Sequence, residues 1–174
     1  MPAGAETGRF PMDRDRVPQV DVESNAAGRA PLEPAPPAGE QVREEPVLAV
    51  ELPAVPESLA LVRHVLAGVA EAVHVPERAL DDLKVAVTEA CTNVVLHAYE
   101  GVAERGPILV DIWHRASRLV VRVSDAGTGM APRLERRSAG LGLGLRLMAM
   151  LTAEVRIVTR PEEGTAVWMT FDLP

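Results

Sequence analysis

The sequence predicts a two-layer α/β sandwich in which helices cover one face of a mostly antiparallel sheet. Two observations support this fold class. Apolar residues recur with helical spacing in three segments, whereas five shorter segments rich in Val and Ile alternate or run apolar as strands do. Taken along the chain, these segments follow the order β-α-α-β-β-α-β-β, which is typical of an α/β sandwich with hairpins at its centre and its end.

The first half of this order contains one strand and two helices. Residues 47–52 form a short strand that Pro53 ends, and a helix opens at residues 56–58 and continues to about residue 73. The second helix begins at Pro76 and stops near residue 99, before a glycine. Its apolar stripe consists of Leu80, Leu83, Val87, Ala90, Val94 and Val95.

The second half predicts two β-hairpins separated by a helix. Residues 108–114 and 118–124 are joined by a polar Ala-Ser turn and form the first hairpin. A helix follows Gly144. Residues 155–159 and 165–171 form the second hairpin across a Pro-Glu-Glu-Gly turn.

Composition divides the chain into a tail and one domain. At 174 residues and 47% hydrophobic, the chain is long enough to bury a proper core. Residues 1–45 contain seven of the 15 prolines and show neither helical nor strand periodicity. We therefore expect a disordered, proline-rich tail over residues 1–45 and a folded domain over residues 46–174.

Charge and cysteine content narrow the classes of function. The net charge of −7 argues against attraction to nucleic acid. The chain shows no signal peptide and no apolar run long enough for a bilayer, so we expect a cytoplasmic protein without a membrane partner. Cys91 is the single cysteine and cannot form an internal disulfide, and we expect it to be a buried thiol.

Four motifs in a fixed order predict an ATP site. Glu89 and Asn93 are four residues apart, which places a carboxylate and an amide on one face of the second helix. An Asp-x-Gly-x-Gly motif formed by Asp125, Gly127 and Gly129 ends a strand. Alone, each of these could be a plain turn or a half-exposed helix face. The remaining motifs are the glycine run Gly140, Gly142 and Gly144, which suits close approach to phosphate, and the Gly164-Thr165 pair.

These motifs and the residues around them resemble a known superfamily. The order is similar to that of the Bergerat-type ATPases and kinases, which include gyrase, Hsp90 and the histidine kinases. The amino-acid sequence resembles that of the anti-sigma factor serine-protein kinases in three segments. These are residues 82–99, DLKVAVTEACTNVVLHAY, residues 142–148 and residues 154–157. This resemblance covers roughly residues 46–174.

The resemblance implies a role for each motif residue. Asp125 would accept the exocyclic amine of adenine, with Gly127 and Gly129 shaping the pocket and Thr165 beside the base. Asn93 would hold Mg²⁺, which prefers oxygen ligands and keeps several waters. Glu89, one helical turn earlier, is the candidate general base towards a serine hydroxyl of a protein substrate. His97, one turn further on, drifts round the helix and is left out of the catalytic set.

The link over residues 130–139 is expected to act as a lid over the phosphates. It contains Arg133, Arg136 and Arg137, whose guanidinium groups suit phosphate oxygens, and Arg137 is our candidate ligand among them. A solvated basic loop is the alternative. The link is shorter than in many anti-sigma factor kinases.

We therefore expect a homodimeric, ATP- and Mg²⁺-dependent serine-protein kinase that binds a sigma factor and phosphorylates the anti-anti-sigma antagonist that would release it. Two alternatives stay open on the sequence. One is a non-catalytic, nucleotide-gated binding module. The other is a switch kinase that activates a phosphatase in a stress-signalling complex.

Overall fold

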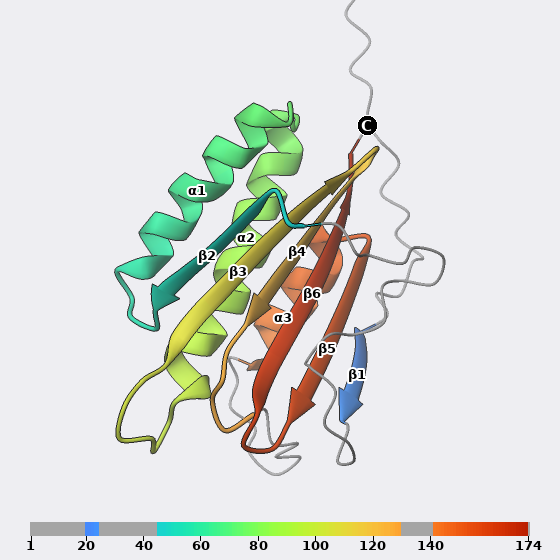
Figure 1. Cartoon of the computed structure of the whole chain (residues 1–174). Coiled ribbons are helices and arrows are strands. Elements are labelled where there is room, and N and C mark those ends of the chain that lie inside the picture. Colours follow the sequence, from blue (N-terminus) through green and yellow to red (C-terminus); the bar gives the residue numbers. More distant parts are fainter. Residues whose placement is uncertain (1–19, 25–44, 130–140, 174) are drawn as a thin grey trace, which may run out of the picture.

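The computed structural model of the chain describes residues 20–24, 45–129 and 141–173. Within these ranges, helices cover one face of a six-stranded sheet (Figure 1). The elements are, in chain order, β1 (Val20–Ser24), β2 (Leu48–Pro53), α1 (Ser58–Ala72), α2 (Glu77–Asn93), the π-helical turn η1 (Val94–Ala98), β3 (Pro107–Arg115), β4 (Arg118–Ser124), α3 (Leu141–Leu151), β5 (Glu154–Arg160) and β6 (Gly164–Asp172). No helix among the described residues is long and apolar enough to cross a membrane.

The strands lie in the order β1-β5-β6-β4-β3-β2. Every neighbouring pair from β5 to β2 is antiparallel, and only β1 runs parallel to its neighbour β5. Because β6 lies between β4 and β5, these two strands are parallel, and α3 lies on the crossover that joins them. The predicted sandwich with a mostly antiparallel sheet and helices on one face is confirmed.

Alternation along the strands decides which side chains face the helices. On β4, Leu119, Val121 and Val123 are buried against the helical layer, whereas Arg118 and Arg122 lie on the opposite face. We call that opposite side the open face of the sheet. The core therefore lies between the sheet and the helices, and Figure 1 shows α2 and α3 directly behind the central strands.

Helix α2 forms the centre of the helical layer because its apolar residues repeat with helical period. Leu83, Val87 and Ala90 are almost fully buried, at 0–1% exposure, and α2 packs against both α1 and α3. The opposite edge of the same helix is polar. Its last two turns bring Glu89 and Asn93, both half-buried, to one end of the sandwich.

Three local features differ from the expectations. The second helix does not continue regularly to residue 99, because its last turn, Val94–Ala98, is a π-helix. Helix α3 begins at Leu141 rather than after Gly144, so that Gly142 and Gly144 lie in its first turn. The strand β1 lies within the segment for which no strand periodicity was recognised. Its partner β5 supplies the hydrogen bonds, and a four-residue alternation leaves little trace in a sequence.

Candidate nucleotide-binding site

The site is built around Asp125, which directly follows the last residue of β4. Its side chain is buried, with 5% of the residue exposed, and its Oδ1 accepts a hydrogen bond of 2.9 Å from the amide of Gly127. The amide of Asp125 in turn donates to the carbonyl of Thr165 at 2.9 Å. The carboxylate is thereby held at the end of β4 beside the start of β6.

Electrostatics at this carboxylate reflect its burial. Desolvation raises the pKa of Asp125, and the backbone hydrogen bonds from Gly127 and Thr165 partly lower it again. The hydrogen bond from Gly127 leaves lone pairs on the carboxylate for a further donor. A buried acceptor of this kind suits the exocyclic amine of a purine, and the role of Asp125 towards adenine stays a prediction.

Gly127 is required by a close approach between backbone segments. A Cβ on this residue would lie 2.0 Å from the carbonyl oxygen of Ala98, and the next residue, Thr128, donates its amide to that same oxygen at 3.0 Å. The loop after β4 is therefore joined directly to the end of η1. No side chain fits between them without moving the backbone of one or the other.

Gly164 plays the corresponding part at the start of β6. It has φ of +100°, and a Cβ on it would lie 2.0 Å from the carbonyl oxygen of Asp125. Gly129, with φ of +76°, lies against the carbonyl of Arg160 in the same way. Thr165 is buried next to Gly164, and its Oγ1 lies 3.3 Å from Oγ1 of Thr159.

A tyrosine that the sequence did not single out ties this site to the helix. The hydroxyl of Tyr99 donates to the carbonyl of Pro107 at 2.8 Å and accepts from the amide of Ala126 at 3.1 Å. It thus bridges the start of β3 and the residue after Asp125. The only signal in the sequence is an aromatic residue at the end of an amphipathic helix before glycine, and such a residue is ordinarily assigned to the core.

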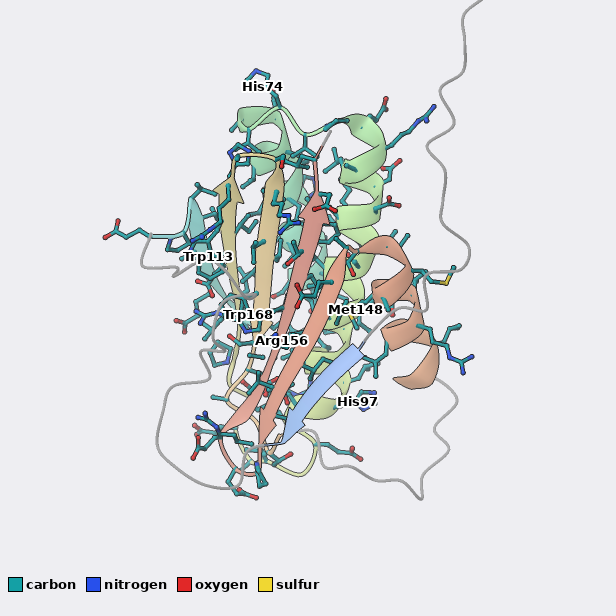
Figure 2. All side chains as sticks on the ribbon, turned by 90° about the vertical axis from the view of Figure 1, so that its right-hand side faces the viewer. His74, His97, Trp113, Met148, Arg156 and Trp168 are labelled. Atoms are coloured by element: carbon teal, nitrogen blue, oxygen red, sulfur yellow. The ribbon has the colours of Figure 1, made fainter. Side chains whose placement is uncertain are left out.

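Glu89 and Asn93 lie on the side of α2 that faces the start of α3. A Cβ on Gly144 would lie 2.9 Å from Oε2 of Glu89, so the carboxylate touches the first turn of α3. Asn93 is the last residue of α2 and directly precedes the π-helical turn. Such turns are frequent at functional sites because they change the direction of neighbouring side chains. His97, by contrast, is exposed at the surface (Figure 2).

The structure therefore contains two groups of predicted residues, which are joined at the end of η1. Asp125, Gly127, Gly129 and Thr165 form one group, and the dipeptide Ala98-Tyr99 links them to the helix that carries the second group. That second group contains Glu89, Asn93 and Gly144. Gly142 lies in the first turn of α3. Gly140 and Arg137, with Arg133 and Arg136, fall outside the described residues, and their roles stay predictions.

Comparison with known proteins identifies this arrangement. Residues 52–171 match the family described as the histidine kinase-like ATPase domain. The serine-protein kinase RsbW of Listeria monocytogenes is 36% identical over 136 residues, which cover 71% of this chain and 85% of that protein. RsbW of Bacillus pumilus is 33% identical over 138 residues, covering 71% and 84%.

The chain belongs to the histidine kinase-like ATPase family, among the relatives of the RsbW serine-protein kinases. Solved structures agree on this fold. The RsbU and RsbW domains of Rv1364c from Mycobacterium tuberculosis superpose with a TM-score of 0.54 at 23% identity, over 74% of this chain and 33% of that one. The SiaB–SiaC complex from Pseudomonas aeruginosa gives a TM-score of 0.53 at 14% identity, over 74% and 91%. The family predicted from the motifs is confirmed.

Proposed function

We propose that this chain is an ATP-dependent serine-protein kinase. The observation that carries the proposal is the position of Glu89. Its carboxylate lies against the first turn of α3, one helical turn from Asn93, at the end of the sandwich where Asp125 is buried. Membership of a family of ATPases whose relatives are named serine-protein kinases supports the same reaction.

The residues around Asp125 bind the nucleotide base. Asp125 accepts the exocyclic amine of adenine, and the fixed backbone of Gly127 and Gly129 forms the walls on either side. Thr165 lies next to the base. Because Tyr99 and the carbonyl of Ala98 hold this loop in place, the acceptor is positioned before the nucleotide arrives.

The phosphates lie towards the start of α3, where the amides of the first helical turn and the positive end of the helix dipole favour an anion. The glycine run from Gly140 to Gly144 allows the backbone to approach closely, and Arg137 provides a charge-assisted contact. Asn93 would hold Mg²⁺ through its side-chain amide oxygen, and the bound ion would neutralise negative charge on the phosphates.

Glu89 acts on the protein substrate. It accepts the proton of the serine hydroxyl as that oxygen bonds to the terminal phosphorus of ATP and ADP leaves. Contact with Gly144 restricts where the carboxylate can lie, so the base is held near the phosphates rather than free in solvent.

The partners follow from the resemblance of residues 82–99 to the anti-sigma factor kinases. We propose that residues 46–174 form the kinase domain, that the protein acts as a cytoplasmic homodimer, and that it binds a sigma factor. Its substrate is then a small anti-anti-sigma antagonist. Phosphorylation adds charge and bulk to the antagonist, which releases it and frees the surface for sigma factor.

The experiment is a competition pull-down with co-purifying partners in ATP, ADP and no nucleotide. Partners are first captured by affinity purification of the full chain and identified by mass spectrometry. We expect unphosphorylated antagonist to be retained in ADP, and sigma factor to replace it in ATP together with a phosphoserine on the antagonist. Partner binding that changes with nucleotide but gives no phosphoserine would favour a non-catalytic binding module. Capture of a phosphatase without sigma factor would favour a switch kinase.

A further inference from the structure

The open face of the sheet carries an aromatic and charged cluster that the kinase site does not use. Trp113 on β3 and Trp168 on β6 stack across β4, with ring centroids 5.4 Å apart and planes 17° apart. Arg122, between them on β4, lies 5.6 Å and 5.3 Å from the two rings. Its guanidinium group also pairs with Asp111 at 2.8 Å. Figure 2 shows both tryptophans on the side of the sheet away from α2.

Two properties of this cluster are those of a covered surface. Trp113 is only 8% exposed and Asp111 only 9%, although no described helix or strand lies over the open face (Figure 1). In addition, Nε1 of Trp168 is buried and has no hydrogen-bond acceptor among the described residues. A buried indole N–H without an acceptor is costly, which indicates that an acceptor belongs beside this N–H, at the edge of the ring.

The connection from β1 to β2 has to cross the sheet. These strands lie at opposite edges, and the pairings make them parallel, so Ser24 and Leu48 are at opposite ends of the sheet as well. The width of five strand spacings is about 24 Å. The 20 residues 25–44 can span about 60 Å as an extended polyproline-type chain, which is ample for a diagonal path.

Crossover handedness selects the face. The connection from β4 to β5 contains α3, so it passes through the helical layer, and it runs towards the edge of the sheet at which β1 lies. The connection from β1 to β2 joins strands of the same direction but moves towards the other edge. Crossovers between parallel strands are right-handed in about 98% of cases. Two connections that run towards opposite edges of the sheet can both be right-handed only if they pass over opposite faces of it. Residues 25–44 are therefore expected over the open face.

From these observations we propose that residues 25–44 dock on the open face, with the proline-rich stretch of residues 31–37, PLEPAPP, seated on the pair Trp113–Trp168. A proline-rich segment suits this surface because its pyrrolidine rings pack on aromatic faces, and because an already extended chain loses little conformational entropy when it binds. Because a polyproline-type chain makes no internal hydrogen bonds, one of its carbonyl groups can accept the hydrogen bond from Nε1 of Trp168. The tail then shields a surface of the kinase domain from other partners.

Tryptophan fluorescence tests this docking directly, because both tryptophans of the protein lie in the cluster. The full chain with Pro31, Pro34, Pro36 and Pro37 replaced by Gly is compared with wild type. We expect red-shifted emission and a several-fold larger acrylamide quenching constant, with an unchanged far-ultraviolet circular dichroism spectrum. The control replaces the three prolines at positions 2, 11 and 18, and should leave the emission unchanged. Wild-type emission and quenching in the quadruple variant would overturn the proposal.

A cross-link identifies the occupant. Ala49 is small and exposed and lies in one cross-strand row with Asp111, Arg122 and Trp168. The native Cys91 is buried and does not interfere. In the full chain carrying Ala35→Cys and Ala49→Cys, a short bismaleimide should give an intramolecular cross-link. Ala35→Cys paired with Arg63→Cys, on the exposed side of α1, should give none. A cross-linked dimer would assign the face to a second copy of the chain, and equal cross-linking to both sites would show no docking; either result refutes the proposal.

Discussion

Replacing Gly144 by Ala separates stability from catalysis at the kinase site. The added Cβ would lie 2.9 Å from Oε2 of Glu89, whereas ordinary contact begins at 3.4 Å. Since the obstructing atom is the end of a flexible side chain, the carboxylate can move by about 0.5 Å or more and the helix need not distort. A misplacement of about 1 Å can cost roughly 10²-fold in rate, so about a tenfold loss of kcat is expected.

Stability should change in the opposite sense. Alanine is favoured over glycine within a helix by about 0.5–1 kcal/mol, so the melting temperature should stay level or rise by a few degrees. Gly68→Ala is the matched control, because Gly68 lies in α1 with no atom within 4 Å of its added Cβ. It should show the same small rise in melting temperature with wild-type kcat. The assay is steady-state transfer of labelled phosphate to the antagonist captured with the protein. A wild-type kcat in Gly144→Ala would refute the positioning of Glu89.

Three further outcomes are expected. Tyr99→Phe removes the hydroxyl that bridges two backbone groups, and chemical denaturation should show a loss of about 1–3 kcal/mol together with weaker ATP binding in calorimetry; unchanged values for both would contradict the bridge. Burial raises the pKa of Asp125, so its contribution to stability is present below the usual Asp range and is lost as pH rises through the raised pKa. Asp125→Asn should therefore melt no lower than wild type at neutral pH, yet lose most of the ATP-induced rise in melting temperature; a full ATP-induced rise would exclude the adenine assignment. Burial also raises the pKa of Cys91 to about 12, so the thiol should react with a disulfide reagent only after the protein unfolds. Rapid labelling of the native protein would contradict this prediction.

Much of the fold could be predicted because its elements have strong periodic patterns. The stripe on α2 recurs every three to four residues, and the strands β3 and β4 alternate around a short polar turn. The π-helical turn could not be predicted, since a change of hydrogen-bond register over one turn hardly alters the spacing of apolar residues. The strand β1 was missed for a different reason: its stability depends on the neighbouring strand β5 rather than on its own composition.

The site divides in the same way. Asp125 and Gly127 could be predicted because turn chemistry is local, and the structure gives each a specific contact. The contact between Glu89 and Gly144 joins residues 55 positions apart and depends on how α3 packs against α2, so spacing alone could not give it. Tyr99 was missed because its role lies in two hydrogen bonds to distant backbone groups.

Phosphoryl transfer from labelled ATP is the most direct test of the proposed function. The purified chain of residues 1–174 is incubated with ATP, Mg²⁺ and the captured antagonist, beside Glu89→Gln as the matched variant. We predict phosphoserine on the antagonist with the wild-type protein. With Glu89→Gln we predict a loss on the order of 10² to 10⁴ in rate at nearly unchanged ATP affinity. Phosphorylation by Glu89→Gln at the wild-type rate would contradict the role of Glu89, and an ATP-bound wild-type protein that forms no phosphoserine would contradict the kinase itself.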